Sequence, residues 1–126
     1  MPRNKSRADE VETLLPLKPQ DYHILFVLLD VERHGYGMVK EIERQTGGRV
    51  RLEAGNLYRS VRRMIQQGLV VESERRPAPE SDDERRRYYS ITDLGRRVVV
   101  AETDRMRELV AAAEAQLAMS DVRAAR

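Results

Sequence analysis

NLYRSVRRMIQQGLVV, residues 56–71, carries the pattern of a helix followed at once by the pattern of a strand. Its apolar side chains recur at the spacing that lines one face of an α-helix, namely Leu57, Val61, Met64 and Ile65. Gly68 is a typical helix end, and the β-branched residues that follow it predict a strand over residues 69–76, up to Pro77. We therefore expect a core-facing helix that leads directly into a strand.

The opposite face of this predicted helix is polar and rich in arginine. It carries Asn56, Arg59, Arg62, Arg63 and Gln66, with Tyr58 at the edge of the apolar stripe. Arginine donates hydrogen bonds in pairs to phosphates and to guanine edges, and asparagine does so to adenine, so we expect Asn56, Arg59 and Arg63 to read bases. The alternative is an ordinary solvated face, since only three lysines occur and arginine dominates the whole chain.

A second arginine cluster brackets a predicted hairpin. PAPESDDE, residues 77–84, reads as a solvated turn, and RRYYSI, residues 86–91, as the returning strand. Tyr88 and Tyr89 alternate across that strand, so one should face the core and the other the surface. The cluster is predicted to hold phosphates or to enter a minor groove, and it consists of Arg75, Arg76, Arg85, Arg86 and Arg87.

Two further helices are predicted before the arginine-rich one. Apolar residues from Tyr22 to Leu29 predict a core helix that starts at Pro19, and residues 36–46 predict a second helix, with Tyr36 packed inside the domain. Residues 1–16 are expected to form a flexible arm. Both histidines, His23 and His34, are read as structural. Three helices followed by a hairpin predict a winged helix-turn-helix over residues 17–91, in a mainly α-helical chain.

Residues 92–126 are expected to form one long helix and a tail. Thr92 supplies an N-cap, and apolar side chains follow at alternating steps of four and three residues, which is a heptad seam. The predicted dimer interface comprises Val99, Thr103, Met106, Val110, Ala113 and Leu117. Because such a helix is longer than a small domain can cover, we favour dimerisation over packing against residues 22–29 of the same subunit.

Composition limits the remaining choices. The 126 residues fit one domain with a net charge of +2, but residues 44–87 hold eleven arginines against seven acidic residues. The chain has no cysteine, no apolar run long enough for a membrane span and no signal region, so we expect a cytoplasmic protein. No catalytic constellation and no metal-ligand or cofactor-binding pattern is present, and we expect no enzyme and no cofactor.

Four motifs in register resemble the PadR-like transcriptional regulators. They are HGYG (residues 34–37), GNLYRSVRRM (55–64), QGLV (67–70) and RRRYYSITDLGRR (85–97). Asn56 and Arg59 depart from the threonine and proline that are common there. The resemblance implies a phosphate contact for the Tyr58 hydroxyl, a homodimer and a small-molecule effector of unknown identity. With no Trp and a single Phe, an aromatic-lined effector pocket has little support.

The sequence thus predicts a dimeric repressor that binds double-stranded DNA at an inverted repeat. The two-fold symmetry of a dimer would present its two reading helices to successive major grooves. The alternative is a winged-helix module that binds an acidic protein partner, for which no DNA sequence preference is expected.

Overall fold

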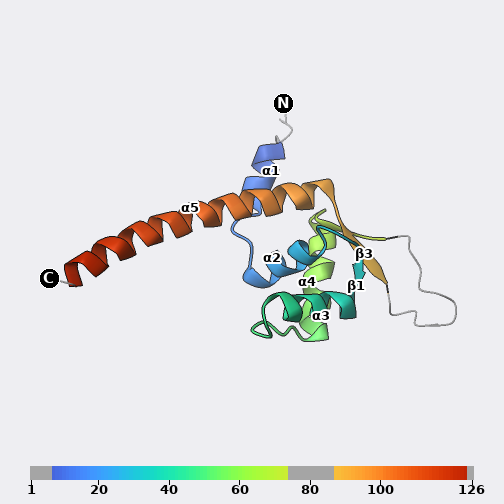
Figure 1. The fold of residues 1–126 in the computed structure, drawn as a ribbon. Helices are drawn as coiled ribbons and strands as arrows, with labels where there is room; N and C mark the ends of the chain where they lie inside the picture. Colours follow the sequence, from blue (N-terminus) through green and yellow to red (C-terminus); the bar gives the residue numbers. More distant parts are fainter. Residues whose placement is uncertain (1–6, 74–86, 125–126) are drawn as a thin grey trace, which may run out of the picture.

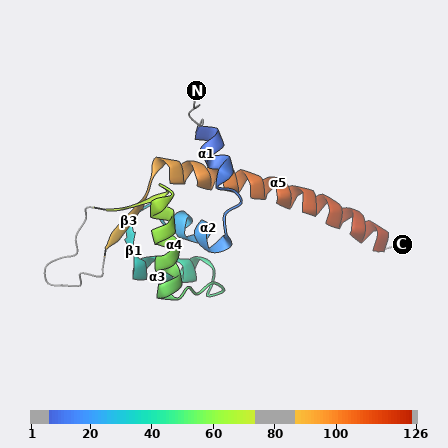
Figure 2. The same cartoon turned by 180° about the vertical axis from the view of Figure 1, so that it is seen from behind.

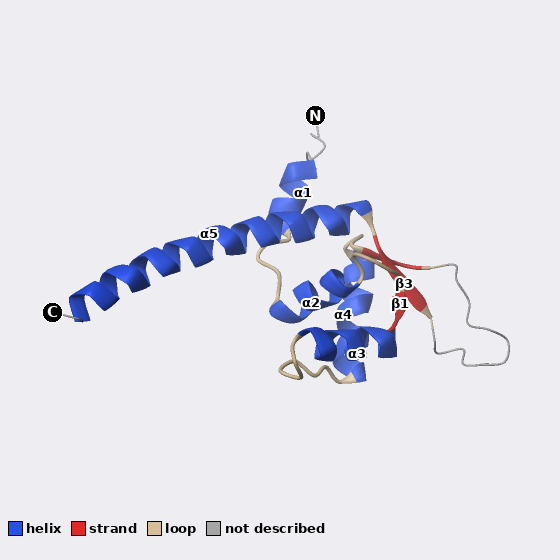
Figure 3. Ribbon diagram, viewed as in Figure 1, coloured by secondary structure: helices blue, strands red, loops and turns tan. Residues whose placement is uncertain are grey.

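The described fold consists of a short N-terminal helix, three helices that form the domain, a small sheet and a long C-terminal helix, α5, Asp93–Ala124 (Figures 1 and 3). The computed structural model describes residues 7–73 and 87–124. Helix α5 runs along one side of the helical domain, and its distal part extends well beyond it, as both Figure 1 and the reverse view in Figure 2 show. The expected mainly α-helical winged helix-turn-helix is confirmed.

Helix α4, Ala54–Gln66, is the predicted arginine-rich helix. Leu57, Val61 and Met64 are fully or almost fully buried, as their spacing predicted. Ile65, which we also placed on the inner face, is 37% exposed, because it lies at the edge of the apolar stripe. Gly68 ends the helix with φ 80°, a backbone conformation that favours glycine, and the Leu69 N–H donates to the Met64 carbonyl at 2.9 Å.

Among residues 7–73 and 87–124 the sheet has three strands, whereas the sequence predicts two. Strand β2, Val70–Glu72, pairs antiparallel with β3, Tyr88–Ile91, with Val70 opposite Ile91. A two-residue strand β1, Arg33–His34, pairs with the other edge of β3. Both hairpin strands are shorter than expected within the described residues, and the predicted turn lies outside them. Tyr89 is buried and Tyr88 is partly exposed, which confirms the predicted alternation.

Helix α2, Pro19–Val27, begins at its proline, and α3, Gly35–Gln45, begins after the His34 cap. His34 Nδ1 accepts a hydrogen bond from the Gly37 N–H at 3.0 Å, which confirms its structural role. The prediction for Tyr36 was wrong. Its side chain is 61% exposed and stacks on the His34 ring, because the first turn of α3 turns this position away from α2 and α4.

Helix α5, Asp93–Ala124, starts at the predicted cap: the Thr92 hydroxyl accepts from the Gly95 N–H at 2.9 Å. Its first third packs on the domain, where Val98 and Val99 are buried, while every residue from 107 to 121 is exposed. Helix α1, Arg7–Thr13, crosses α5 (Figures 1 and 2). The expectation of a flexible arm was therefore wrong for residues 7–13, because burial of Val11 stabilises a helical turn there.

Candidate nucleic-acid interface

The exposed face of α4 carries two arginines and a glutamine. Arg59, Arg62 and Gln66 are all solvent-exposed, and at about 100° per residue they fall within an arc of roughly 60°. Arg59 donates a hydrogen bond to the Asn56 side-chain oxygen one turn earlier, so these two side chains lie together at the start of the helix. A helix with this face outward, on a buried apolar stripe, can present cationic and amide donors to a groove.

Tyr58 lies on the side of α4 that faces the start of α3. Its ring packs against the core, and its hydroxyl end lies directly over Gly35. A Cβ atom at residue 35 would be 2.7 Å from the Tyr58 Cζ atom, so glycine is what allows α3 and α4 to approach so closely. The ring position agrees with the expected core-edge packing. The phosphate contact of its hydroxyl stays a prediction.

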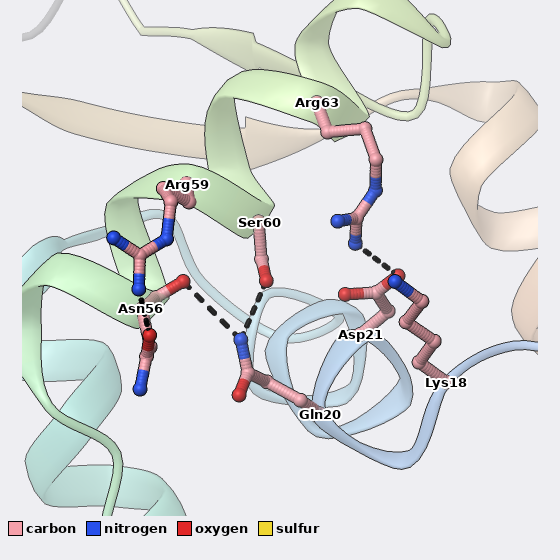
Figure 4. Close-up of a pocket in the computed structure, with 7 residues that line it drawn as sticks. All are labelled: Lys18, Gln20, Asp21, Asn56, Arg59, Ser60 and Arg63. Carbon is pink, nitrogen blue, oxygen red and sulfur yellow. Dashed lines mark hydrogen bonds and ion pairs between the residues drawn. The ribbon is translucent and has the colours of Figure 1, made fainter.

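The other side of α4 faces the first turn of α2, across a pocket of about 280 Å³ (Figure 4). Gln20 joins the two helices: its Nε2 donates to the Asn56 carbonyl at 3.2 Å and to the buried Ser60 hydroxyl at 2.5 Å. The remaining polar side chains that line the pocket are Lys18, Asp21, Arg59 and Arg63. The pocket is therefore a polar cleft beside the exposed arginine face.

The Arg63 side chain forms an ion pair inside this pocket. Its Nη2 donates to the Asp21 Oδ2 atom at 2.5 Å, and Asp21 is buried while the Arg63 side chain is 37% exposed. The sequence placed Arg63 on the most exposed face of the helix, whereas in the structure it lies on the flank against α2. Sequence reasoning did not find Asp21, because an acid in the first turn of a helix is ordinarily explained by the helix dipole.

The wing contributes one described arginine from the predicted cluster. Arg87 precedes β3, and its Nη1 lies 3.5 Å from the Glu72 Oε2 atom on β2, with most of the Arg87 side chain exposed. On β3, burial raises the pKa of the Tyr89 hydroxyl above its ordinary value. The other four predicted wing residues lie outside the described residues, and they are Arg75, Arg76, Arg85 and Arg86.

The predicted dimer seam divides into two parts. Val99 is only 5% exposed within the single chain, and the Thr103 hydroxyl hydrogen-bonds to the Tyr22 hydroxyl at 2.8 Å, so the same subunit covers both. Met106 is partly exposed, at the border. The positions beyond it are open, and they are Val110, Ala113 and Leu117. The start of the heptad pattern thus packs within the same subunit, as the alternative interpretation of the sequence expects.

Two kinds of site are missing from the part of the chain that the structure describes. It contains no cluster of three or more side chains suited to holding a metal ion. None of its helices combines the length and apolar character that a membrane crossing needs.

Comparison with known proteins gives the family. No curated protein matches the chain. RosR from H. salinarum is similar in structure, with 26% identity, a TM-score of 0.60, and coverage of 85% of this chain and 98% of that one. A PadR family transcription regulator from Clostridium difficile R20291 has 19% identity, a TM-score of 0.64, and coverage of 79% and 99%.

Bacillus subtilis PadR, solved in complex with operator DNA, has 17% identity and a TM-score of 0.57. The match covers 67% of this chain and 47% of that protein, so this chain aligns with about half of it. The model of the transcriptional regulator PadR-like family matches residues 24–101, which include α3, α4, the described wing strands and the start of α5. That range is more than half of the chain, and the protein belongs to the PadR-like family of transcriptional regulators.

Proposed function

We propose that this protein is a homodimeric repressor that binds double-stranded DNA at an inverted repeat. The observation that carries the proposal is the exposed face of α4, where Arg59, Arg62 and Gln66 project from a helix whose opposite side buries Leu57, Val61 and Met64. The solved complex of Bacillus subtilis PadR with operator DNA supports it, since that protein shares the fold. Repression would follow from occupation of a promoter.

In this proposal, α4 enters the major groove and its flanks contact the two DNA strands. Arg59 and Arg62 would donate to guanine edges, and Gln66 or Asn56 to adenine. The wing arginines, of which Arg87 is exposed at the base of β3, would hold phosphates. Tyr58 has its hydroxyl at the α3 side of the helix, where a phosphate contact would position α4 without reading sequence.

The second copy of the chain would pack on the distal half of α5. Leu109, Val110, Leu117 and Met119 are each more than half exposed there, on a helix that extends beyond its own domain (Figure 1). Leu109, Val110 and Leu117 fall within an arc of about 100° on α5, and burying them against the same helix of a partner removes them from water and yields a two-fold axis. Two reading helices related by that axis would face successive major grooves, about 34 Å apart.

Selection of binding sites from random double-stranded DNA at physiological salt tests the proposal. We expect an enriched inverted repeat with half-sites separated by about 10 base pairs, or a multiple of that spacing, and a protein mass in solution of twice the chain. The Arg59→Ala variant should weaken binding to the selected site by about 1–3 kcal/mol and lose discrimination at one base position. Arg107→Ala, which removes another exposed arginine, on α5, is the matched control.

A winged-helix module that binds an acidic protein is the competing function. It would enrich no DNA motif, and Arg59→Ala would then affect DNA binding no more than Arg107→Ala does. Either result would rule out sequence-specific regulation by α4.

A further inference from the structure

Asp21 and Arg63 form an ion pair at the edge of the reading helix. Asp21 lies in the first turn of α2, with its side chain 8% exposed, and its Oδ2 atom accepts from Arg63 Nη2 at 2.5 Å. Figure 4 shows the Arg63 side chain reaching down from α4 to Asp21 across the pocket. The guanidinium is thus directed toward α2, about 40° around the helix from Arg59.

The buried carboxylate of Asp21 favours the position of Arg63 in the pocket, because the ion pair compensates the burial of its charge. The second oxygen of Asp21, Oδ1, is buried and has no hydrogen-bond partner among the described residues. If Arg63 swung into a groove, the carboxylate would lose the one described hydrogen bond that compensates its burial. Removing one partner of a buried pair changes the equilibrium by a factor on the order of 150 to several thousand, and the lower end applies here because Arg63 is partly solvated.

A contact between Arg63 and a base gains no more than the loss of the Asp21 ion pair costs. A good bidentate arginine–guanine contact discriminates by a factor of roughly 5 to 150. Breaking the ion pair with Asp21 costs a factor of about 150 or more, which equals or exceeds the upper end of this range. Arg59 and Arg62 bear no such cost, because neither is paired with a carboxylate in the described residues. The energies therefore favour reading through Arg59 and Arg62, with Arg63 retained on the flank.

The position of Asp21 is itself fixed. Gln20, the preceding residue, donates to the Asn56 carbonyl and to the Ser60 hydroxyl, and so joins the first turn of α2 to the first half of α4. Val27 and Leu28 at the other end of α2 are buried in the core. Helix α2 consequently cannot follow Arg63 if the arginine moves toward DNA, and the pair must either persist or break.

We propose that Asp21 is a specificity-determining positioning residue, which keeps the Arg63 guanidinium in the α2–α4 pocket and out of the base-reading face. Arg63 then stabilises the angle between the two helices and adds no base preference. Without Asp21, Arg63 gains access to the groove and to phosphates as a third, competing arginine. The inference rests on the proposed function, since it presupposes that α4 reads DNA.

The test compares base preferences in selections from random double-stranded DNA, using Asp21→Ala and a matched variant, Glu53→Ala. Glu53 is exposed, stands next to the start of α4 and makes no cap hydrogen bond, so its removal changes the charge equally without freeing Arg63. Asp21→Ala should lose roughly fivefold of discrimination at one position of each half-site, and should bind scrambled DNA roughly three- to tenfold more tightly with a steeper salt dependence. Glu53→Ala should keep every preference of the wild type.

The double variant Asp21→Ala/Arg63→Ala tests whether Arg63 contributes to base preference in the wild type. It contains no buried unpaired carboxylate, so it avoids the destabilisation expected of Arg63→Ala alone. We expect it to recover the base preferences of the wild type. The proposal is overturned if the double variant lacks a preference that the wild type has, since Arg63 would then read that base, or if Asp21→Ala behaves as Glu53→Ala does.

Failure of the proposed function has a different signature. If the wild type itself selects no motif, sequence-specific binding fails, and the specificity role of Asp21 fails with it. If the wild type selects a motif and Asp21→Ala has the same base preferences as Glu53→Ala, the role of Asp21 is refuted while the proposed function stands. Circular dichroism melts of all four proteins verify that each variant is folded.

Discussion

Replacing Gly35 by alanine should force α3 and α4 apart. A Cβ atom at this position would lie 2.7 Å from Tyr58 Cζ and 3.0 Å from Cε1, with the hydroxyl oxygen nearer still. The Tyr58 ring is packed against the core, so it cannot turn aside freely. Forcing atoms into such a contact costs about 1–3 kcal/mol. The better helix propensity of alanine offsets at most about 1 kcal/mol of that, and less in the first turn.

We therefore expect Gly35→Ala to destabilise the fold by about 1–2 kcal/mol, which corresponds to a fall in Tm of roughly 4–8 °C for a chain of this size. Thermal melts followed by circular dichroism measure it. All samples need the same protein concentration, since association would change the apparent stability. Gly55→Ala is the matched control. It is also in the first turn of a helix, no atom lies within 4 Å of its would-be Cβ, and it should raise stability slightly.

A double-mutant cycle identifies the cause. In the Tyr58→Ala background the ring is gone, so Gly35→Ala should cost little or become favourable, which is a coupling of about 1 kcal/mol or more. An equal penalty in both backgrounds would refute the steric reasoning. So would a Gly35→Ala protein as stable as Gly55→Ala.

Two predictions concern α5. Leu117→Glu should convert the proposed dimer to a monomer, measured by light scattering, with unchanged helix content per chain, because Leu117 is 62% exposed and touches no core; an unchanged mass would contradict an interface on this part of the helix. The second concerns Glu102, where the hydrogen bond from Arg105, assisted by the Leu17 N–H, lowers the carboxyl pKa below its usual 4.5. Because the pKa is lowered in the folded state, the ionised carboxylate stabilises the fold above pH 4.5 and loses that effect as pH falls through the lower value. The stability difference between wild type and Glu102→Gln should therefore narrow below about pH 4.5, and a constant difference in pH-dependent urea melts would count against this.

The sequence predicts best where one local rule acts alone. Spacing alone predicts the stripe of Leu57, Val61, Met64 and Ile65, and its first three side chains are buried while Ile65 lies at its edge. Residue type alone predicts the Thr92 cap, and its hydroxyl accepts a hydrogen bond from the Gly95 N–H. In each case the signal lies within a few neighbouring residues, so no knowledge of the tertiary structure is required.

Long-range pairing accounts for what the sequence could not predict. Strand β1 has only two residues and exists because Arg33 pairs with Tyr89, 56 residues later in the chain. The Asp21–Arg63 contact likewise joins residues 42 positions apart, and no periodicity encodes it. Val99 fits both a heptad seam and a core position, since both use apolar side chains at the same spacing, and only the fold distinguishes them.

The domain connects its two candidate surfaces through α2. On one side, the Tyr22 hydroxyl bonds to Thr103 on α5, and on the other, Gln20 bonds to Ser60 on α4. The two contact residues on α2 are separated by one position, so they belong to the same turn. In the proposed dimer, the distal part of α5 would set the two-fold axis, and this turn of α2 would then fix the direction of α4 relative to that axis. Half-site spacing would consequently depend on the packing of α2 against its two neighbours, as much as on the side chains that touch DNA.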